Sequence, residues 1–259
     1  MIDLHLIGIG TGNPDHLTAQ AVAAMNQADL ILLPRKGQAK SDLIDLRREI
    51  CAQVLTGPTR IVEFDLPVRG GPVRGNGATY LDDVNAWHDA IADAWQAQIT
   101  QHLPGGGTLA LLVWGDPSLY DSTLRIADRL SSAGVEITVR VVPGITSLQA
   151  LTAAHAMPLN PLAGPVTITT GRLLRAHGWP AGADTIVVML DSGGAFEGLQ
   201  PQGITIWWGA YLGMAHEALE QGPLAKAGPR IALRRAELRA RHGWIMDVYL
   251  MRRELADGT

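Results

Sequence analysis

Residues 108–122 read TLALLVWGDPSLYDS, a continuous apolar run followed by a turn-forming tripeptide. An apolar run of this length that ends in Gly and Pro is typical of a strand buried on both faces, as in a parallel sheet. Ligands of open α/β sheets bind beyond the carboxyl ends of such strands. The stretch therefore predicts an α/β fold and makes Gly115-Asp116-Pro117 a candidate site.

Comparable segments lie on both sides of this stretch. Helical spacing of apolar residues predicts helices at 79–102 and 122–132. Short apolar runs predict further strands at 2–9, 30–33, 60–64 and 136–142. The alternation of strands and helices indicates a parallel sheet with helices on both faces.

Three prolines, Pro158, Pro161 and Pro165, then interrupt the pattern. They place a domain boundary near residue 160, with a first domain at 1–160 and a second at 161–259. Strand-like runs follow at 166–170, 185–190, 204–208, 230–234 and 244–251. The polar residues 236–242 fit a hairpin-like return between the last two runs. We therefore expect the second domain to be a smaller, mixed sheet.

The composition narrows the function classes. The chain has 259 residues, 47% of them hydrophobic, and a formal net charge of −4, which gives no general positive field for nucleic acid. Its single cysteine, Cys51, cannot form an internal disulfide and fits a reducing cytoplasm. No apolar run reaches the ~18 residues of a membrane span. No histidines have ligand spacing such as HxxxH, so we expect no bound metal.

A glycine-rich loop, GIGTGNPDHLT, follows the first predicted strand. It is similar to a dinucleotide fingerprint, but Gly8, Gly10 and Gly12 have GxGxG spacing instead of GxGxxG. Pro14 also stands where the phosphate-binding helix would begin. A NAD-dependent oxidoreductase is therefore a remote alternative. The glycines themselves indicate a tight turn or a close approach of backbone segments.

Three segments follow predicted strands in order: LIGIGTGNPDHLT at 6–18, VWGDPSLYDS at 113–122 and VVPGITSLQALTAA at 141–154. Together they resemble the tetrapyrrole (corrin/porphyrin) methyltransferase family, and the resemblance covers the whole chain. It implies a two-domain fold, with an N-terminal parallel α/β sheet, a C-terminal mixed α/β sheet and a cleft between them. It also implies that S-adenosylmethionine is the cofactor and S-adenosylhomocysteine the product.

The resemblance further implies which residues contact the cofactor. They lie at predicted strand ends in both domains: Trp114, Gly115, Asp116, Pro117, Leu119, Thr146, Ser147, Met189, Leu190, Ala210 and Tyr211. The residue types alone leave other roles open. Gly, Asp and Pro are common in β-turns, and Thr146 is a suitable helix cap.

Two segments, PRKGQAKSDLIDLRREIC at 34–51 and GDPSLYDSTLRI at 115–126, resemble a subgroup of the family that acts in cobalamin synthesis. The resemblance implies methylation of C-1 of precorrin-5, with loss of its acetyl group as acetate. Acetate release requires water to attack a carbonyl, which a positioned base assists. The sequence singles out no catalytic residue, and the candidates near strand ends are Asp65, Tyr120, Asp121 and Asp191.

Precorrins carry many carboxylate side chains, and arginine pairs with carboxylates bidentately. The candidate substrate contacts are Gly10, Gly12, Arg35, Lys36, Arg69 and Arg74. Arg47 and Arg48 lie further into a predicted helix, and we expect them at the surface.

Several alternatives stay open from the sequence. The chain could act on a different precorrin carbon, on RNA or on a modified protein residue, although the acidic balance disfavours RNA. It could also bind a tetrapyrrole without catalysis. We expect a small-molecule tetrapyrrole partner and no nucleic-acid or membrane partner, and the family resemblance implies a homodimer.

Overall fold

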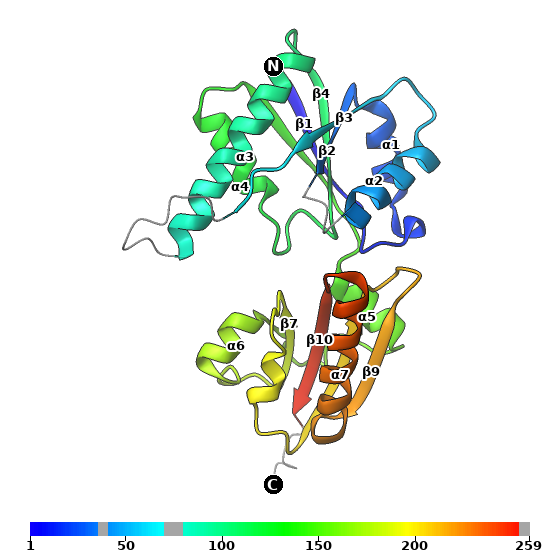
Figure 1. Ribbon diagram of the computed structural model, residues 1–259, viewed down its shortest axis with the longest axis vertical. Coiled ribbons are helices and arrows are strands. Elements are labelled where there is room, and N and C mark those ends of the chain that lie inside the picture. Colours follow the sequence, from blue (N-terminus) through cyan, green and yellow to red (C-terminus); the bar gives the residue numbers. More distant parts are fainter. Residues whose placement is uncertain (36–40, 70–79, 254–259) are drawn as a thin grey trace. The chain divides into compact units, whose positions relative to one another are not determined.

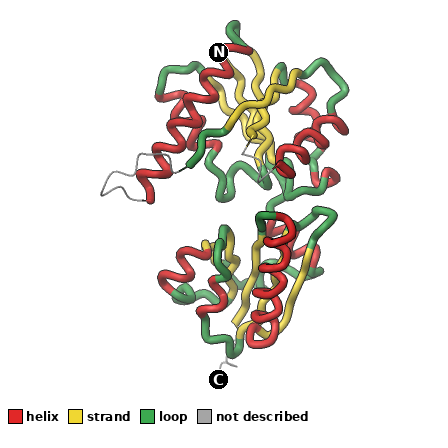
Figure 2. The backbone as a smooth tube through the Cα atoms, viewed as in Figure 1, coloured by secondary structure: helices red, strands yellow, loops and turns green. Residues whose placement is uncertain are grey.

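The computed structural model describes residues 1–35, 41–69 and 80–253. The chain divides into two compact units, each with its own sheet (Figure 1, Figure 2). The first unit comprises Met1–Gly10 and Pro14–Ile145, and the second comprises Thr11–Asn13 and Thr146–Thr259.

A five-stranded parallel sheet forms the centre of the first unit. Its strands are β1 (Ile2–Gly8), β2 (Leu30–Arg35), β3 (Arg60–Asp65), β4 (Gly107–Val113) and β5 (Ile137–Val142). Their spatial order is β3-β2-β4-β1-β5, and every neighbouring pair is parallel. The predicted parallel sheet is confirmed, with β4 at its centre as the apolar run indicated.

Four helices cover the two faces of this sheet: α1 (Ala19–Gln27), α2 (Ser41–Val54), α3 (Tyr80–His102) and α4 (Thr123–Ser132). Helices α1 and α2 pack on one face, whose core contains Met25 and Ile50. Helices α3 and α4 pack on the other, whose core contains Trp95 and Ile126 (Figure 1). Strands β2 and β4 are neighbours, yet the helices that follow them lie on opposite faces, which makes their carboxyl ends a topological switch point.

Local sequence signals account for these helices. The hydroxyl oxygen of Thr18 accepts a 3.0 Å hydrogen bond from the backbone N–H of Ala21, so Thr18 caps α1. In α3, Ile91, Trp95 and Ile99 recur every four residues and are buried in the core. This spacing is the apolar stripe from which the helix was predicted.

A mixed five-stranded sheet forms the second unit. Its strands are β6 (Thr167–Thr170), β7 (Thr185–Met189), β8 (Ile204–Ala210), β9 (Ala218–Pro223) and β10 (Asp247–Arg253). Their order is β6-β7-β10-β8-β9, in which only β6 and β7 pair in parallel. Its helices are α5 (Ser147–Ala154), α6 (Gly171–His177) and α7 (Leu224–His242). The predicted mixed α/β sheet is confirmed.

The division between the units lies earlier than the proline cluster indicated. The second unit begins at Thr146, whereas the prolines pointed to residue 160. The cause is α5, which contacts β8 and β10 and therefore belongs to the second sheet.

One predicted strand is wrong. Residues 230–234 lie inside α7, and so do the polar residues 236–242 that were expected to form a turn. The buried positions Ile231, Arg235 and Leu238 have helical spacing, with a buried arginine completing the stripe. A short apolar run does not by itself distinguish a strand from a buried helix.

The described part of the chain contains no helix that is long and apolar enough to cross a membrane.

Candidate active site

Three glycines bring together the loops that follow β1, β4 and β5. A Cβ added to Gly144 would lie 2.1 Å from the carbonyl oxygen of Gly115, and one added to Gly8 would lie 2.6 Å from the backbone nitrogen of Gly144. Backbone atoms occupy the space that a side chain would need, so only glycine permits this contact. Close backbone approach therefore explains Gly8, as the sequence indicated.

A pair of backbone hydrogen bonds joins the first glycine loop to the loop after β4. Gly115 donates to the carbonyl of Gly10 at 2.8 Å, and Gly10 donates back at 3.3 Å. Both residues have positive φ, 73° at Gly10 and 68° at Gly115. The structure thus places a candidate substrate contact, Gly10, beside a candidate cofactor contact, Gly115. Gly12, with φ 128°, lies in the short segment grouped with the second unit.

The carboxylate of Asp116 ties two of these loops together. Its Oδ2 accepts a 2.8 Å hydrogen bond from the backbone N–H of Gly144, and its Oδ1 accepts bonds from the N–H and hydroxyl of Ser118. Burial raises the pKa of Asp116, but these hydrogen bonds outweigh it and hold the pKa below its ordinary value. Both oxygens are engaged within the chain, so we infer that Asp116 positions the loop.

An Asp116→Asn variant tests this role. At neutral pH we expect its free energy of unfolding to fall by about 2 kcal/mol, because an amide nitrogen would face one of the N–H donors and the charge is lost. The pKa of Asp116 is lower in the folded state than in the unfolded chain. The stabilisation by its carboxylate is therefore complete above the unfolded pKa of about 3.9 and is lost as the pH falls through the folded pKa. Urea unfolding across this pH range measures both effects. The exposed Asp128→Asn is the control, and equal stabilities of the two variants would contradict the role.

Thr146 and Ser147 form the start of α5. The hydroxyl oxygen of Thr146 accepts a 3.2 Å bond from the N–H of Leu148, and the Gln149 side chain accepts a 3.0 Å bond from the N–H of Thr146. This is a capping box. The Thr146 side chain therefore stabilises the helix.

Three candidate residues have a left-handed backbone. The φ angles of Tyr120, Leu190 and Tyr211 are 50°, 51° and 51°, which costs a non-glycine residue about 1–3 kcal/mol and is often found at ligand sites. Leu190 directly follows β7, and Tyr211 directly follows β8. Leu190 is 64% exposed, whereas Tyr211 is fully buried.

The Tyr211 side chain packs inside the second unit. Its ring packs against Trp244, His216 and His242, and its hydroxyl donates to the carbonyl oxygen of Trp244. Ala210 is fully buried and Met189 is half-buried. A ligand would therefore meet these strand ends mainly through their backbone groups.

The candidate substrate cations have partners within the first unit. Arg35, at the end of β2, forms a bidentate ion pair of 2.9 and 3.1 Å with the catalytic candidate Asp65, at the end of β3. The Arg69 guanidinium lies 6.0 Å from the ring centre of Trp87. Lys36 and Arg74 lie outside the described residues.

Asp191 lies in a buried network of the second unit. Its carboxylate accepts hydrogen bonds from Arg175, from the Tyr249 hydroxyl and from the backbone N–H groups of Gly193 and Ala195. Burial raises the pKa of Asp191, yet these bonds outweigh it and lower the pKa. A carboxylate that already accepts four bonds is poorly suited to take a proton from water, so we infer a structural role.

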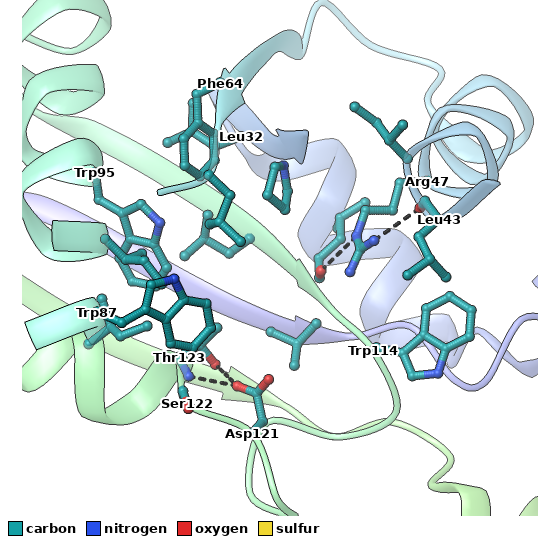
Figure 3. A pocket seen from close by; sticks show the side chains of 18 residues that line it. Leu32, Leu43, Arg47, Phe64, Trp87, Trp95, Trp114, Asp121, Ser122 and Thr123 are labelled. Atoms are coloured by element: carbon teal, nitrogen blue, oxygen red, sulfur yellow. Dashed lines mark hydrogen bonds between the residues drawn. The ribbon is translucent and has the colours of Figure 1, made fainter. Parts of the chain in front are cut away.

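A cavity of about 240 Å³ lies at the switch point between β2 and β4 (Figure 3). Pairing between these strands ends at Leu32 and Leu111, although both strands continue. Its walls are largely apolar and include Trp87, Trp95 and Trp114. The cavity therefore opens where two neighbouring strands separate.

Two charged side chains face this cavity, Arg47 from α2 and Asp121 from the loop before α4 (Figure 3). Arg47 Nε donates to the carbonyl of Leu112 at 3.2 Å, just beyond the last β2–β4 pair, and Nη1 donates to the carbonyl of Leu43 at 3.0 Å. Asp121 Oδ1 accepts hydrogen bonds from the N–H and hydroxyl of Thr123. The expectation that Arg47 lies at the surface is wrong. Its position four residues after Leu43 places it on the apolar side of α2 and could have revealed it.

The described residues include no group of three or more His, Cys, Asp or Glu side chains that could hold a metal ion.

Comparison with known proteins identifies the family of this chain. The sequence model of the tetrapyrrole (corrin/porphyrin) methylases matches residues 3–228. A precorrin-6A synthase [deacetylating] from Sinorhizobium sp is 47% identical over 250 residues, covering 96% of this chain and 94% of that protein.

Solved structures share the fold. A cobalamin synthesis related protein (CobF) from Corynebacterium diphtheriae superposes with a TM-score of 0.82 at 36% identity, covering 98% of this chain and 99% of the other. A uroporphyrin-III C-methyl transferase from Thermus thermophilus, complexed with S-adenyl homocysteine, has a TM-score of 0.58 at 18% identity and covers 96% of each chain. At that identity the second likeness shows the fold alone.

Proposed function

The chain belongs to the tetrapyrrole (corrin/porphyrin) methylase family, and from that premise we propose that it is a precorrin-6A synthase (deacetylating). It methylates C-1 of precorrin-5 with S-adenosylmethionine and releases the acetyl group as acetate. The observation that carries this proposal is the 47% identity, over 96% of the chain, to a protein of that name.

S-adenosylmethionine supplies a methyl group on a sulfonium, so the main contribution of the chain is to position the reactants. The proposed cofactor contacts are those named from the sequence, at 114–117, 119, 146–147, 189–190 and 210–211. These residues fit a ligand that is held largely by backbone groups. Gly115 places no side chain over its backbone, the Asp116 carboxylate and Thr146 hydroxyl are bonded within the chain, and Leu190 has a left-handed backbone.

The exposed Arg35–Asp65 pair supports a role in substrate binding. Surface ion pairs contribute only about 0–1 kcal/mol, so a precorrin carboxylate can replace Asp65 as the partner of Arg35 at little cost. We also propose that the protein works as a cytoplasmic homodimer, as the family resemblance and the single cysteine indicated.

Incubation with precorrin-5 and S-adenosylmethionine carrying a deuterated methyl group tests the function. Mass spectrometry should detect a product that has gained one labelled methyl group and lost the acetyl group, together with free acetate. A labelled product that retains the acetyl group would contradict deacetylation. Recovery of unlabelled precorrin-5 from a folded enzyme would contradict methyl transfer.

A further inference from the structure

The cavity at the β2–β4 switch point contains a guanidinium, that of Arg47, with which no described carboxylate forms a direct ion pair; the nearest opposing charge that lines the cavity is Asp121. By contrast, the adjacent Arg48 pairs at the surface with Asp45 and Glu63. Burial lowers the pKa of the Arg47 guanidinium to about 10, against the opposing effect of the Asp121 charge. Arg47 is only partly exposed to solvent, and a charge with little access to water is costly unless it is paired at close range, so its guanidinium at an apolar cavity is suited to an anionic ligand.

The size of the cavity limits that ligand. Pockets that enclose a whole drug-sized molecule measure about 300–1,000 Å³, whereas this one measures about 240 Å³. It therefore suits a small acid or one side arm of a larger molecule. A macrocycle does not fit inside it.

The residues that line the cavity indicate the chemical class of its ligand. The planar N–H fork of arginine matches a carboxylate or phosphate, and the indole rings of Trp87, Trp95 and Trp114 suit a short carbon chain. Asp121 also faces the cavity (Figure 3). Its negative charge opposes a phosphate group, with its charge of about −1.5 to −2, more strongly than a singly charged carboxylate.

We infer that this cavity binds one short aliphatic carboxylate, of the size of acetate or propionate. The carboxylate pairs with Arg47, and its carbon chain lies among the tryptophan side chains. The source of the carboxylate rests on the proposed function: it is either a side arm of the precorrin or the acetate that the reaction releases.

Calorimetry on the free protein tests the site without the reaction. Wild-type protein should bind propionate and acetate but not the neutral analogue propionamide. Arg47→Met should weaken binding about tenfold or more, because the bidentate charged pair is lost. Asp121→Asn should tighten binding severalfold, because it removes a like charge from the cavity.

Arg48→Met is the matched control, since it removes the adjacent arginine of α2 but leaves the cavity unchanged, and it should bind propionate as the wild type does. If Arg47→Met does not fold, Arg47→Lys replaces it and should also weaken binding. The inference is overturned if the wild type binds neither acid, or if the Arg47 variant binds propionate as well as Arg48→Met does.

Repeating the titration in the presence of precorrin-5 identifies the source. If precorrin-5 blocks propionate, a side arm of the substrate occupies the cavity. If acetate still binds, the cavity receives the released product. Failure of methyl transfer to precorrin-5 would overturn the proposed function but would leave the binding measured on the free protein unchanged.

Discussion

Arg235→Met is expected to lower the free energy of unfolding by about 3–5 kcal/mol, the range for removing one partner of a buried ion pair. Arg235 of α7 lies 2.8 Å from Asp247 of β10, and the two side chains are only 11% and 3% exposed. Arg235 also donates to the backbone carbonyl of Asp191, after β7. Its removal leaves the Asp247 carboxylate buried, with the hydrogen bond from Trp208 as its remaining partner among the described side chains.

The stability lost in Arg235→Met should depend on pH. Burial already raises the pKa of Asp247 in the wild type, against the opposing effect of Arg235, and removal of Arg235 raises it further. When the pKa of Asp247 is higher in the folded variant than in the unfolded chain, the protonated carboxyl stabilises the fold. This contribution is complete below the unfolded pKa and is lost as the pH rises through the folded pKa. The deficit should therefore be smaller in acid than at neutral pH.

Arg234→Met provides the control, because Arg234 lies next to Arg235 in α7 and forms a 3.6 Å ion pair with Glu237 in which both side chains are about half exposed. Such surface pairs contribute about 0–1 kcal/mol. Urea unfolding measures the losses, and hydrogen exchange should locate the effect of Arg235→Met in β8 and β10. Equal losses for the two variants would contradict a stabilising role for the buried pair.

The contrast between β4 and residues 230–234 shows how far the sequence predicts the fold. The run at 108–113 ends in a Gly-Asp-Pro turn, so its type and end can both be predicted locally. Residues 230–234 carry no such turn. They lie inside α7, where Arg235 is buried against Asp247, a contact that a pattern of apolar residues does not reveal.

The candidate site also has some features that the sequence predicts and others that it does not. The glycines after the first strand predicted a tight turn or a close approach of backbone segments, and at Gly8 the structure shows the close approach. The roles of Asp116 and Arg47 depend on tertiary contacts. The N–H group that donates to the Asp116 carboxylate belongs to Gly144, in another loop. The cavity that Arg47 faces exists because β2 and β4 separate. An arginine on a helix reads as a surface residue until its neighbours in space are known.

Gly144→Ala is expected to destabilise the protein and to displace the loops of the candidate site. Its Cβ would lie 2.1 Å from the carbonyl oxygen of Gly115 and 2.8 Å from Cα of Gly8, and all of these are backbone atoms. No rotamer change relieves this overlap, so the loops after β1, β4 and β5 must separate. Overpacking usually costs about 1–3 kcal/mol and occasionally more, and we expect about 3 kcal/mol here because backbone must move.

The displaced loops include Gly115 and the backbone N–H of Gly144, which donates a hydrogen bond to Asp116. Gly144→Ala should therefore also weaken the binding of S-adenosylhomocysteine, which calorimetry on the folded protein measures. Gly105→Ala is the control, because a Cβ at Gly105 meets no atom within 4 Å and Gly105 is not among the residues with positive φ. That change should leave binding intact and stability equal or slightly higher, since alanine restricts the unfolded chain. If Gly144→Ala keeps the wild-type affinity and stability, the contact among the three glycines does not hold these loops in place.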